Sequence, residues 1–288
     1  MGQSMSDSDR DVSSSTSASG SGTTRLVING QRLPGRIFVF CLVIELSFVL
    51  LDAVVNYGEL TRLGPIRRLF NITREDGLAT WFMVAQTFVA ALVLWLIFLV
   101  YRSRCYGRGK VIAWGFLAGF FTYMSADDGA KIHERMGSVF SELHSSAGSV
   151  PSGDLPGRLQ AIFPSYDWQL VALPLLAGAG LFMLIFLLHE LGDRKGRVLL
   201  LLAVGFMTIA VGLDFIEGLD DSHAWNIQVG IREAFDLSKY TVRHFAKSLE
   251  EFLEMVAISL LLVLFVRHLI RVVESYLVVD FRGRKAPE

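Results

Sequence analysis

The sequence predicts an all-α fold, a polytopic integral membrane protein built as a bundle of about six transmembrane helices. The 288 residues are 52% hydrophobic and only 19% charged, whereas soluble domains have about 25% charged residues. The apolar residues also come in blocks near the ~20 residues that a helix needs to cross a bilayer while satisfying its own backbone. We therefore expect the lipid bilayer to be a partner of most of the chain.

The chain divides into three predicted parts. Residues 1–24 are rich in Ser, Gly and Thr and lack the apolar side chains of a core, so we expect a disordered tail. Residues 25–272 form the predicted transmembrane domain, and residues 273–288 form a basic tail. The spans are expected at 37–55, 78–101, 111–127, 169–189, 198–216 and 249–270. The third apolar block is the shortest, so Ser125 and the carboxylates after it are needed to complete that crossing.

Basic residues in the short loops predict the orientation. The loops at 102–110 and 191–197 are rich in Arg and Lys, and short basic loops stay in the cytoplasm. An even number of spans then places both termini in the cytoplasm, with the protein in the cell membrane. The segment 57–77 also carries several Arg residues and opposes this orientation. The formal net charge of −1 gives no reason to expect a nucleic-acid partner.

Ionisable side chains gather at the predicted outer ends of three spans. Buried acids cost several kcal/mol unless they are paired, protonated or bound to a cation. Carboxylates and imidazoles from separate helices are the ligands of zinc and other divalent transition metals. We expect such a metal as cofactor, held by Asp128, His133, Glu134, Asp214 and Glu254. Asp127, Glu217, Glu250 and His244 are secondary candidates. With Glu251 as general base, the site would support hydrolysis of a small molecule, lipid or cell-envelope substrate.

Other interpretations of the same residues stay open. Asp127 and Glu134 share a helix face only if the helix continues through Gly129, whereas Asp128 and His133 converge only if it kinks or ends there. Ser248-x-x-Glu251 also fits a capping box at a helix start.

Two other functions compete with the hydrolytic site. In a transporter, intramembrane acids such as Glu45 would relay protons or hold a coupled cation. In a structural protein, the acids would only fix the packing of the helices.

Three segments of the chain resemble segments of a group of uncharacterised bacterial multi-span membrane proteins. Residues 125–135 resemble its S-x-D-E-x4-H-E-R segment, and residues 249–255 resemble its L-E-E-x-x-E-M segment at the entry to the last helix. Residues 70–82 resemble its acidic segment before a Thr-Trp-Phe helix start. This chain has Asp128 where the group has Glu, which keeps a carboxylate at that position. The resemblance implies a multi-span fold in the bacterial inner membrane and candidate positions, but no activity.

Overall fold

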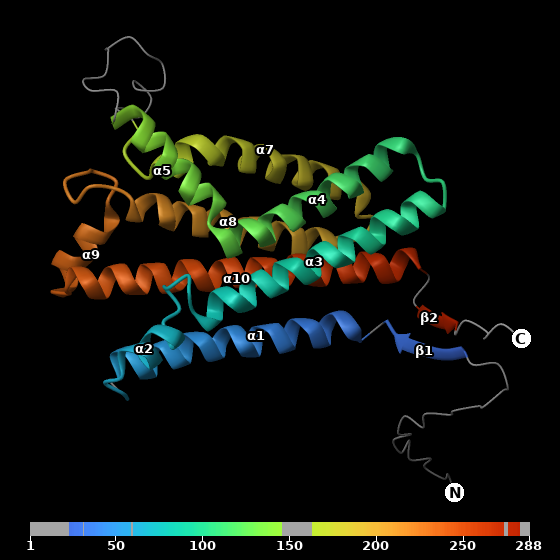
Figure 1. Ribbon diagram of the computed structural model, residues 1–288, viewed down its shortest axis with the longest axis horizontal. Coiled ribbons are helices and arrows are strands. Elements are labelled where there is room, and N and C mark those ends of the chain that lie inside the picture. Colours follow the sequence, from blue (N-terminus) through green and yellow to red (C-terminus); the bar gives the residue numbers. More distant parts are fainter. Residues whose placement is uncertain (1–22, 31, 59, 146–162, 274–275, 283–288) are drawn as a thin grey trace, which may run out of the picture.

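The described residues of the computed structural model are 23–30, 32–58, 60–145, 163–273 and 276–282. They are almost entirely helical, and the long helices lie side by side in a bundle (Figure 1). The prediction of an all-α fold is therefore confirmed. The helices are α1 (Leu33–Asp52) with its π-helical continuation η1 (Ala53–Tyr57), α2 (Gly64–Phe70), α3 (Leu78–Ser103), α4 (Arg108–Ala130), α5 (Ile132–Ser145), α7 (Asp167–Glu190), α8 (Arg194–Glu217), α9 (Ile227–Phe235) and α10 (Lys239–Val272).

Within the described ranges, five helices are long and apolar enough to cross a membrane. They are α1 with η1, α3, α7, α8 and α10. The predicted third span falls on α4, which has 23 residues and is not among these five helices. Its last turns carry Ser125, Asp127 and Asp128. The count of six spans and the orientation of the termini stay predictions.

Helix α10 lies at the centre of the bundle. In its most apolar window 78% of the residues are buried, whereas the corresponding share is 17–33% in the other four helices. Side chains such as Phe265 and Leu264 of α10 pack with Trp114 of α4 in the main core. The surrounding helices expose large apolar side chains such as Phe40 and Leu50. Helices that are hydrophobic on their outer faces are typical of a bundle surrounded by lipid.

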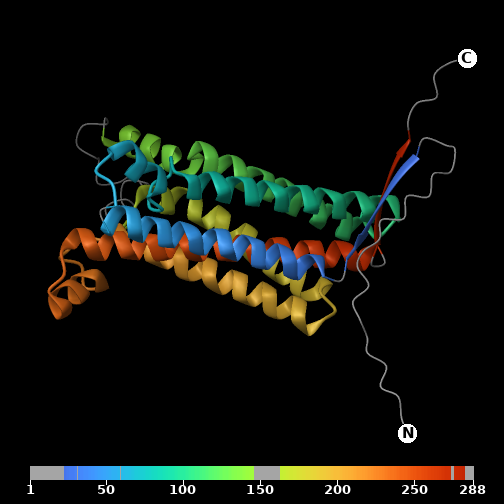
Figure 2. The ribbon, with the colours of Figure 1, turned by 90° about the horizontal axis from the view of Figure 1, so that it is seen from below.

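A short two-stranded ribbon pairs the first and last described segments of the chain. Strand β1 (Thr23–Asn29) pairs antiparallel with β2 (Tyr276–Arg282), a feature that the sequence analysis did not predict. The ribbon lies at the end of the bundle opposite α5 and α9 (Figure 2). Most of the predicted tail at 1–24 lies outside the described residues, as do 283–288 of the predicted basic tail. The predicted domain boundaries stay predictions.

The last helix begins ten residues before the predicted start at 249. Its N-cap is Ser238, whose Oγ accepts a hydrogen bond of 3.0 Å from the backbone N–H of Thr241. Ser248 and Glu251 therefore lie well inside α10. The capping-box interpretation of these two residues is wrong, because a capping box requires a helix start at Ser248.

Candidate functional site

A cavity of about 800 Å³ opens at the end of the bundle where α5 and α9 lie. It lies among α5, the start of α7, the end of α8, the start of α10 and the segment before α3. We call it the carboxylate pocket, because the described residues that line it include six acids and only two cationic side chains. The acids are Glu75, Glu134, Glu142, Asp167, Asp214 and Glu217, and the cationic residues are Arg243 and Lys247.

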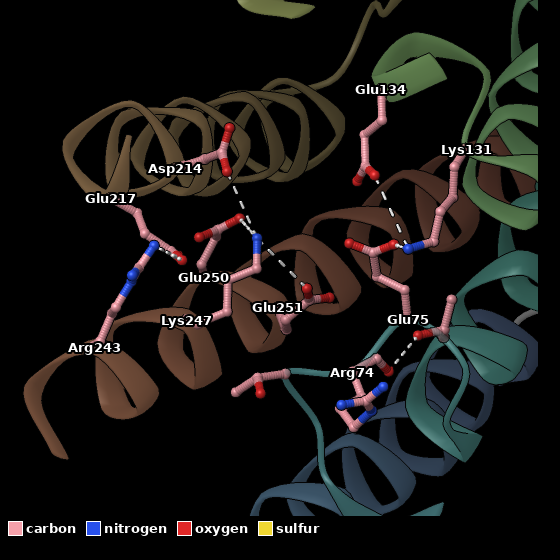
Figure 3. A network of polar contacts seen from close by, with 12 residues as sticks. Arg74, Glu75, Lys131, Glu134, Asp214, Glu217, Arg243, Lys247, Glu250 and Glu251 are labelled. Carbon is pink, nitrogen blue, oxygen red and sulfur yellow. Dashed lines mark hydrogen bonds and ion pairs between the residues drawn. The ribbon is translucent and has the colours of Figure 1, made fainter. Parts of the chain in front are cut away.

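Lys247 connects three of the predicted site residues. Its Nζ lies 2.6 Å from Glu250 Oε1, 3.6 Å from Asp214 Oδ1 and 3.8 Å from Glu251 Oε1 (Figure 3). The other oxygen of Asp214 accepts a hydrogen bond of 2.8 Å from Gln169. Glu250 and Glu251 follow Lys247 by three and four positions, the spacing at which side chains meet on one helix face. These acids from α8 and α10 therefore surround an ammonium group.

A second cation crosses from α10 to the end of α8. Arg243 lies 3.2 Å from Glu217, and its guanidinium donates to the hydroxyl of Tyr166 over 3.5 Å. Burial and the Glu217 carboxylate raise the pKa of Tyr166, although Arg243 acts in the opposite direction. Tyr166 is thus a neutral hydrogen-bonding group at the pocket wall.

The turn between α4 and α5 changes which residues meet. Helix α4 ends at Ala130, and Lys131 adopts left-handed backbone angles with φ 53°. Of the two alternatives at this point, the shared helix face of Asp127 and Glu134 is therefore not formed. Lys131 instead pairs with Glu75 and lies 3.9 Å from Glu134, so that Glu134 faces the pocket from α5 (Figure 3).

The same turn brings His133 to Asp127. The two carboxylate oxygens of the buried Asp127 accept from the backbone N–H of His133 at 2.8 Å and pair with its ring Nδ1 at 2.7 Å. Burial lowers the pKa of His133, but the hydrogen bond and charge of Asp127 outweigh it and raise that pKa. The expected helix end near Gly129 is present, but the partner of His133 is Asp127 and not Asp128.

His244 lines the pocket and reaches back to the first helix. Its Nε2 lies 2.7 Å from Asp52, and both side chains are about 95% buried. Asn56 donates to the second oxygen of Asp52 at 2.8 Å. His244 is thus held in a buried pair that the sequence analysis did not foresee.

The remaining predicted site residues do not line the pocket. Glu254 is half-buried on α10 and close enough to Asp128, Glu250 and Glu251 to interact with them electrostatically. Among the residues that the structure describes, no group of three or more His, Cys, Asp or Glu side chains is arranged to hold a metal ion. The expected metal site and the general-base role of Glu251 both stay predictions.

Sequence reasoning missed the cations that organise these acids. Lys247 was detectable, because it precedes Glu250 and Glu251 by three and four positions on one predicted helix. Arg243 and Tyr166 come from elements far apart in the sequence, and no local pattern joins them.

Comparison with known proteins matches most of the chain to a protein family. Residues 36–268 match the model of a family described as a domain of unknown function, DUF8692. Neither the curated proteins nor the solved structures contain a match to the chain.

Proposed function

Because the chain belongs to the DUF8692 family, whose function is unknown, we propose a function from the geometry: a membrane protein that binds an organic cation in its carboxylate pocket. In this proposal α4 is the third of six spans and both termini lie on one side of the membrane. The even count agrees with the pairing of β1 with β2, which holds both described ends of the chain at one end of the bundle.

The composition of the pocket wall carries the proposal. Six carboxylates and two cationic side chains line it among the described residues, so that acids outnumber bases. Lys247 and Arg243 already occupy some of these acids, and they show the kind of group that this wall accommodates. Glu75 before α3 and Glu134 on α5 share the single ammonium group of Lys131, and in this proposal these two acids would hold a further positive charge.

Aromatic side chains favour an organic cation over a bare ion. Tyr166, Trp168 and Tyr240 line the same pocket. A cation over an aromatic face gains ~0.5–2 kcal/mol, and quaternary ammonium groups are recognised in this way. A small divalent ion would instead need several oxygens at fixed short distances. The wall thus suits an ammonium group that carries carbon substituents.

A hydrolytic metal centre has less support in this geometry. His133 is engaged by Asp127, and Asp214 and Glu251 lie against Lys247. These partners leave fewer lone pairs for an ion. The structural alternative, in which the acids only fix helix packing, accounts for the Lys247 cluster but not for an 800 Å³ cavity.

Ligand binding to the full-length protein in detergent tests the proposal. Choline and spermidine are titrated at constant ionic strength, and the dissociation constant is measured by calorimetry. We expect saturable binding that weakens about 5- to 30-fold in Trp168→Leu and in Glu134→Gln, as a loss of ~1–2 kcal/mol implies. The matched control is Glu190→Gln, at the opposite end of the bundle, which should bind like the parent.

Two outcomes would contradict it. If neither compound binds at millimolar concentration, the pocket does not take an organic cation. Saturable binding of Mg²⁺ that choline does not displace would assign the acids to a metal ion instead.

A further inference from the structure

A second polar group lies in the core of the bundle, away from the carboxylate pocket. Glu45 of α1, Gln86 of α3 and Ser259 of α10 meet there, with exposed fractions of 0%, 4% and 0%. Gln86 Nε2 donates to Glu45 Oε1 at 3.0 Å, and Ser259 Oγ donates to the same oxygen at 2.7 Å. Gln86 Nε2 also donates to Ser259 Oγ at 2.5 Å. Three helices thus contribute to one closed set of hydrogen bonds.

This set lacks a donor. All the donor groups of Gln86 and Ser259 are used, but Glu45 Oε2 and Gln86 Oε1 are buried and have no hydrogen-bond partner. Unsatisfied buried oxygens are costly, and an ionised carboxylate in an apolar interior costs far more. A proton on Glu45 would supply one missing donor and would remove the charge.

The surroundings of Glu45 offer no other compensation. The groups that face it are Gln86, Ser259 and, one turn earlier on α1, the thiol of Cys41. Across the described part of the chain, no Lys, Arg or His forms an ion pair with Glu45. The oxygens of three side chains are fewer than the six or more ligands of a bound Ca²⁺ or Mg²⁺. A proton needs no such coordination shell, because it bonds to a single carboxylate oxygen.

Apolar packing separates this group from both ends of the bundle. Phe48 and Val49, the next turn of α1 toward the pocket, pack against a cluster that contains Met83 and Met255. Phe38 and Leu42, on the other side of Glu45, pack against the main core. Exchange of a proton with water therefore requires α1 to move away from α3 and α10.

We propose that Glu45, Gln86 and Ser259 form a proton-binding site in the bundle core, with the proton carried by the Glu45 carboxyl. Intramembrane acids of this kind serve proton relays and proton-coupled movement. The inference concerns residues that do not line the carboxylate pocket and does not rest on binding of an organic cation there. Proton binding at this site would couple the docking of α1 to the protonation state of one carboxyl.

Infrared spectroscopy of the full-length protein at pH 7 tests the proposal. The spectrum of Glu45→Gln, a substitution of nearly the same shape, is subtracted from that of the parent protein. We expect the loss of one carboxylic-acid C=O band. The matched variant Glu190→Gln, whose carboxylate pairs with Lys110 at 2.8 Å, should instead lose the bands of an ionised carboxylate.

The opposite results would overturn it. Loss of carboxylate bands in Glu45→Gln would show that Glu45 is ionised, and a change in these bands when Na⁺ replaces K⁺ would assign the site to a metal cation. If Glu45→Gln does not fold, Ser259→Ala keeps the test decisive. It removes a hydrogen bond to Glu45 Oε1, so that the carboxylic-acid band must shift if the proposal is correct.

Discussion

Acidic and basic side chains gather at both ends of the bundle: the end with the carboxylate pocket (the pocket end) and the end with the β1–β2 ribbon (the ribbon end). The two ends differ in how many basic partners each acid has. At the ribbon end, Glu190 accepts from the hydroxyl of Tyr101 at 2.6 Å and pairs with Lys110. Asp193 pairs with Arg267 at 2.7 Å and with Arg271 at 2.6 Å. Each acid there has at least two partners. At the pocket end, three acids share the single ammonium of Lys247.

This difference separates a structural role from a binding role. Fully partnered charges fix the ends of α7, α8 and α10 and leave little capacity for a ligand. The carboxylates at the pocket end keep oxygens that accept no hydrogen bond, such as Glu217 Oε2 at the pocket wall and Glu250 Oε2 next to Lys247. The two ends therefore respond differently to the same kind of substitution.

The largest contrast is expected from removing one lysine at each end. Lys247→Met leaves Asp214, Glu250 and Glu251 without their shared cation, and breaking a buried pair in this way costs roughly 3–5 kcal/mol. Lys110→Met removes an ion pair in which the lysine side chain is 52% exposed, and such pairs contribute about 0–1 kcal/mol. Reversible unfolding in mixed detergent micelles measures both free energies.

Lys247→Arg is the control for this comparison. It keeps a positive charge and should recover most of the loss caused by Lys247→Met. Equal losses at the two ends would contradict the view that only the pocket end shares its charges.

A smaller contrast is expected from two glycines. A Cβ at Gly137 of α5 would lie 2.6 Å from the backbone N of Trp168 and 2.8 Å from its Cα, so that α5 and α7 must separate. We expect Gly137→Ala to cost roughly 1–3 kcal/mol and to weaken choline binding, because Trp168 lines the pocket. Calorimetry and unfolding measure the two effects.

Gly119→Ala in α4 is the matched control. A Cβ there would meet nothing within 4 Å, and alanine favours a helix over glycine by up to ~1 kcal/mol. Unchanged stability and binding in Gly137→Ala would show that the contact between α5 and α7 does not shape the pocket.

Much of the helical bundle was predictable because block length and hydropathy are local properties of the sequence. The start of α10 was not, because polar and apolar residues mix between Lys239 and Ser248 and give no local sign of where the last helix begins. The β ribbon joins segments more than 240 residues apart, and nothing local indicates their pairing.

The candidate site was predictable only in part, for a similar reason. The one-ended gathering of acids followed from the predicted spans, and the Lys247 cluster obeys helical spacing. The partners of Asp127, Asp52 and Glu45 were not predictable. One depends on the left-handed turn at Lys131, and the others come from helices that are distant in the sequence.

The smallest contrast is expected in the dependence of stability on pH. Burial by itself raises the pKa of Asp193, but hydrogen bonds from Arg271, the backbone of Gly196 and Arg267 lower it overall. The contribution of ionised Asp193 to the free energy of unfolding is therefore complete above the ordinary aspartate pKa of about 4. It is lost as the pH falls through the lowered pKa. The pKa of His133 is raised, so its effect on stability depends on pH in the opposite direction. Its contribution is complete below the ordinary value of about 6.5 and is lost as the pH rises through the raised pKa.

We expect the unfolding free energy, measured as a function of pH, to decline both at acid pH and at alkaline pH. The decline is about 1.4 kcal/mol for each tenfold difference in the acid dissociation constant of the group between the folded and the unfolded protein. Asp193→Asn should flatten the acid limb and leave the alkaline limb unchanged, whereas His133→Asn should flatten the alkaline limb, because each substitution removes one of the two titrating groups. A change of the alkaline limb in Asp193→Asn would show that the two ends of the bundle are not independent.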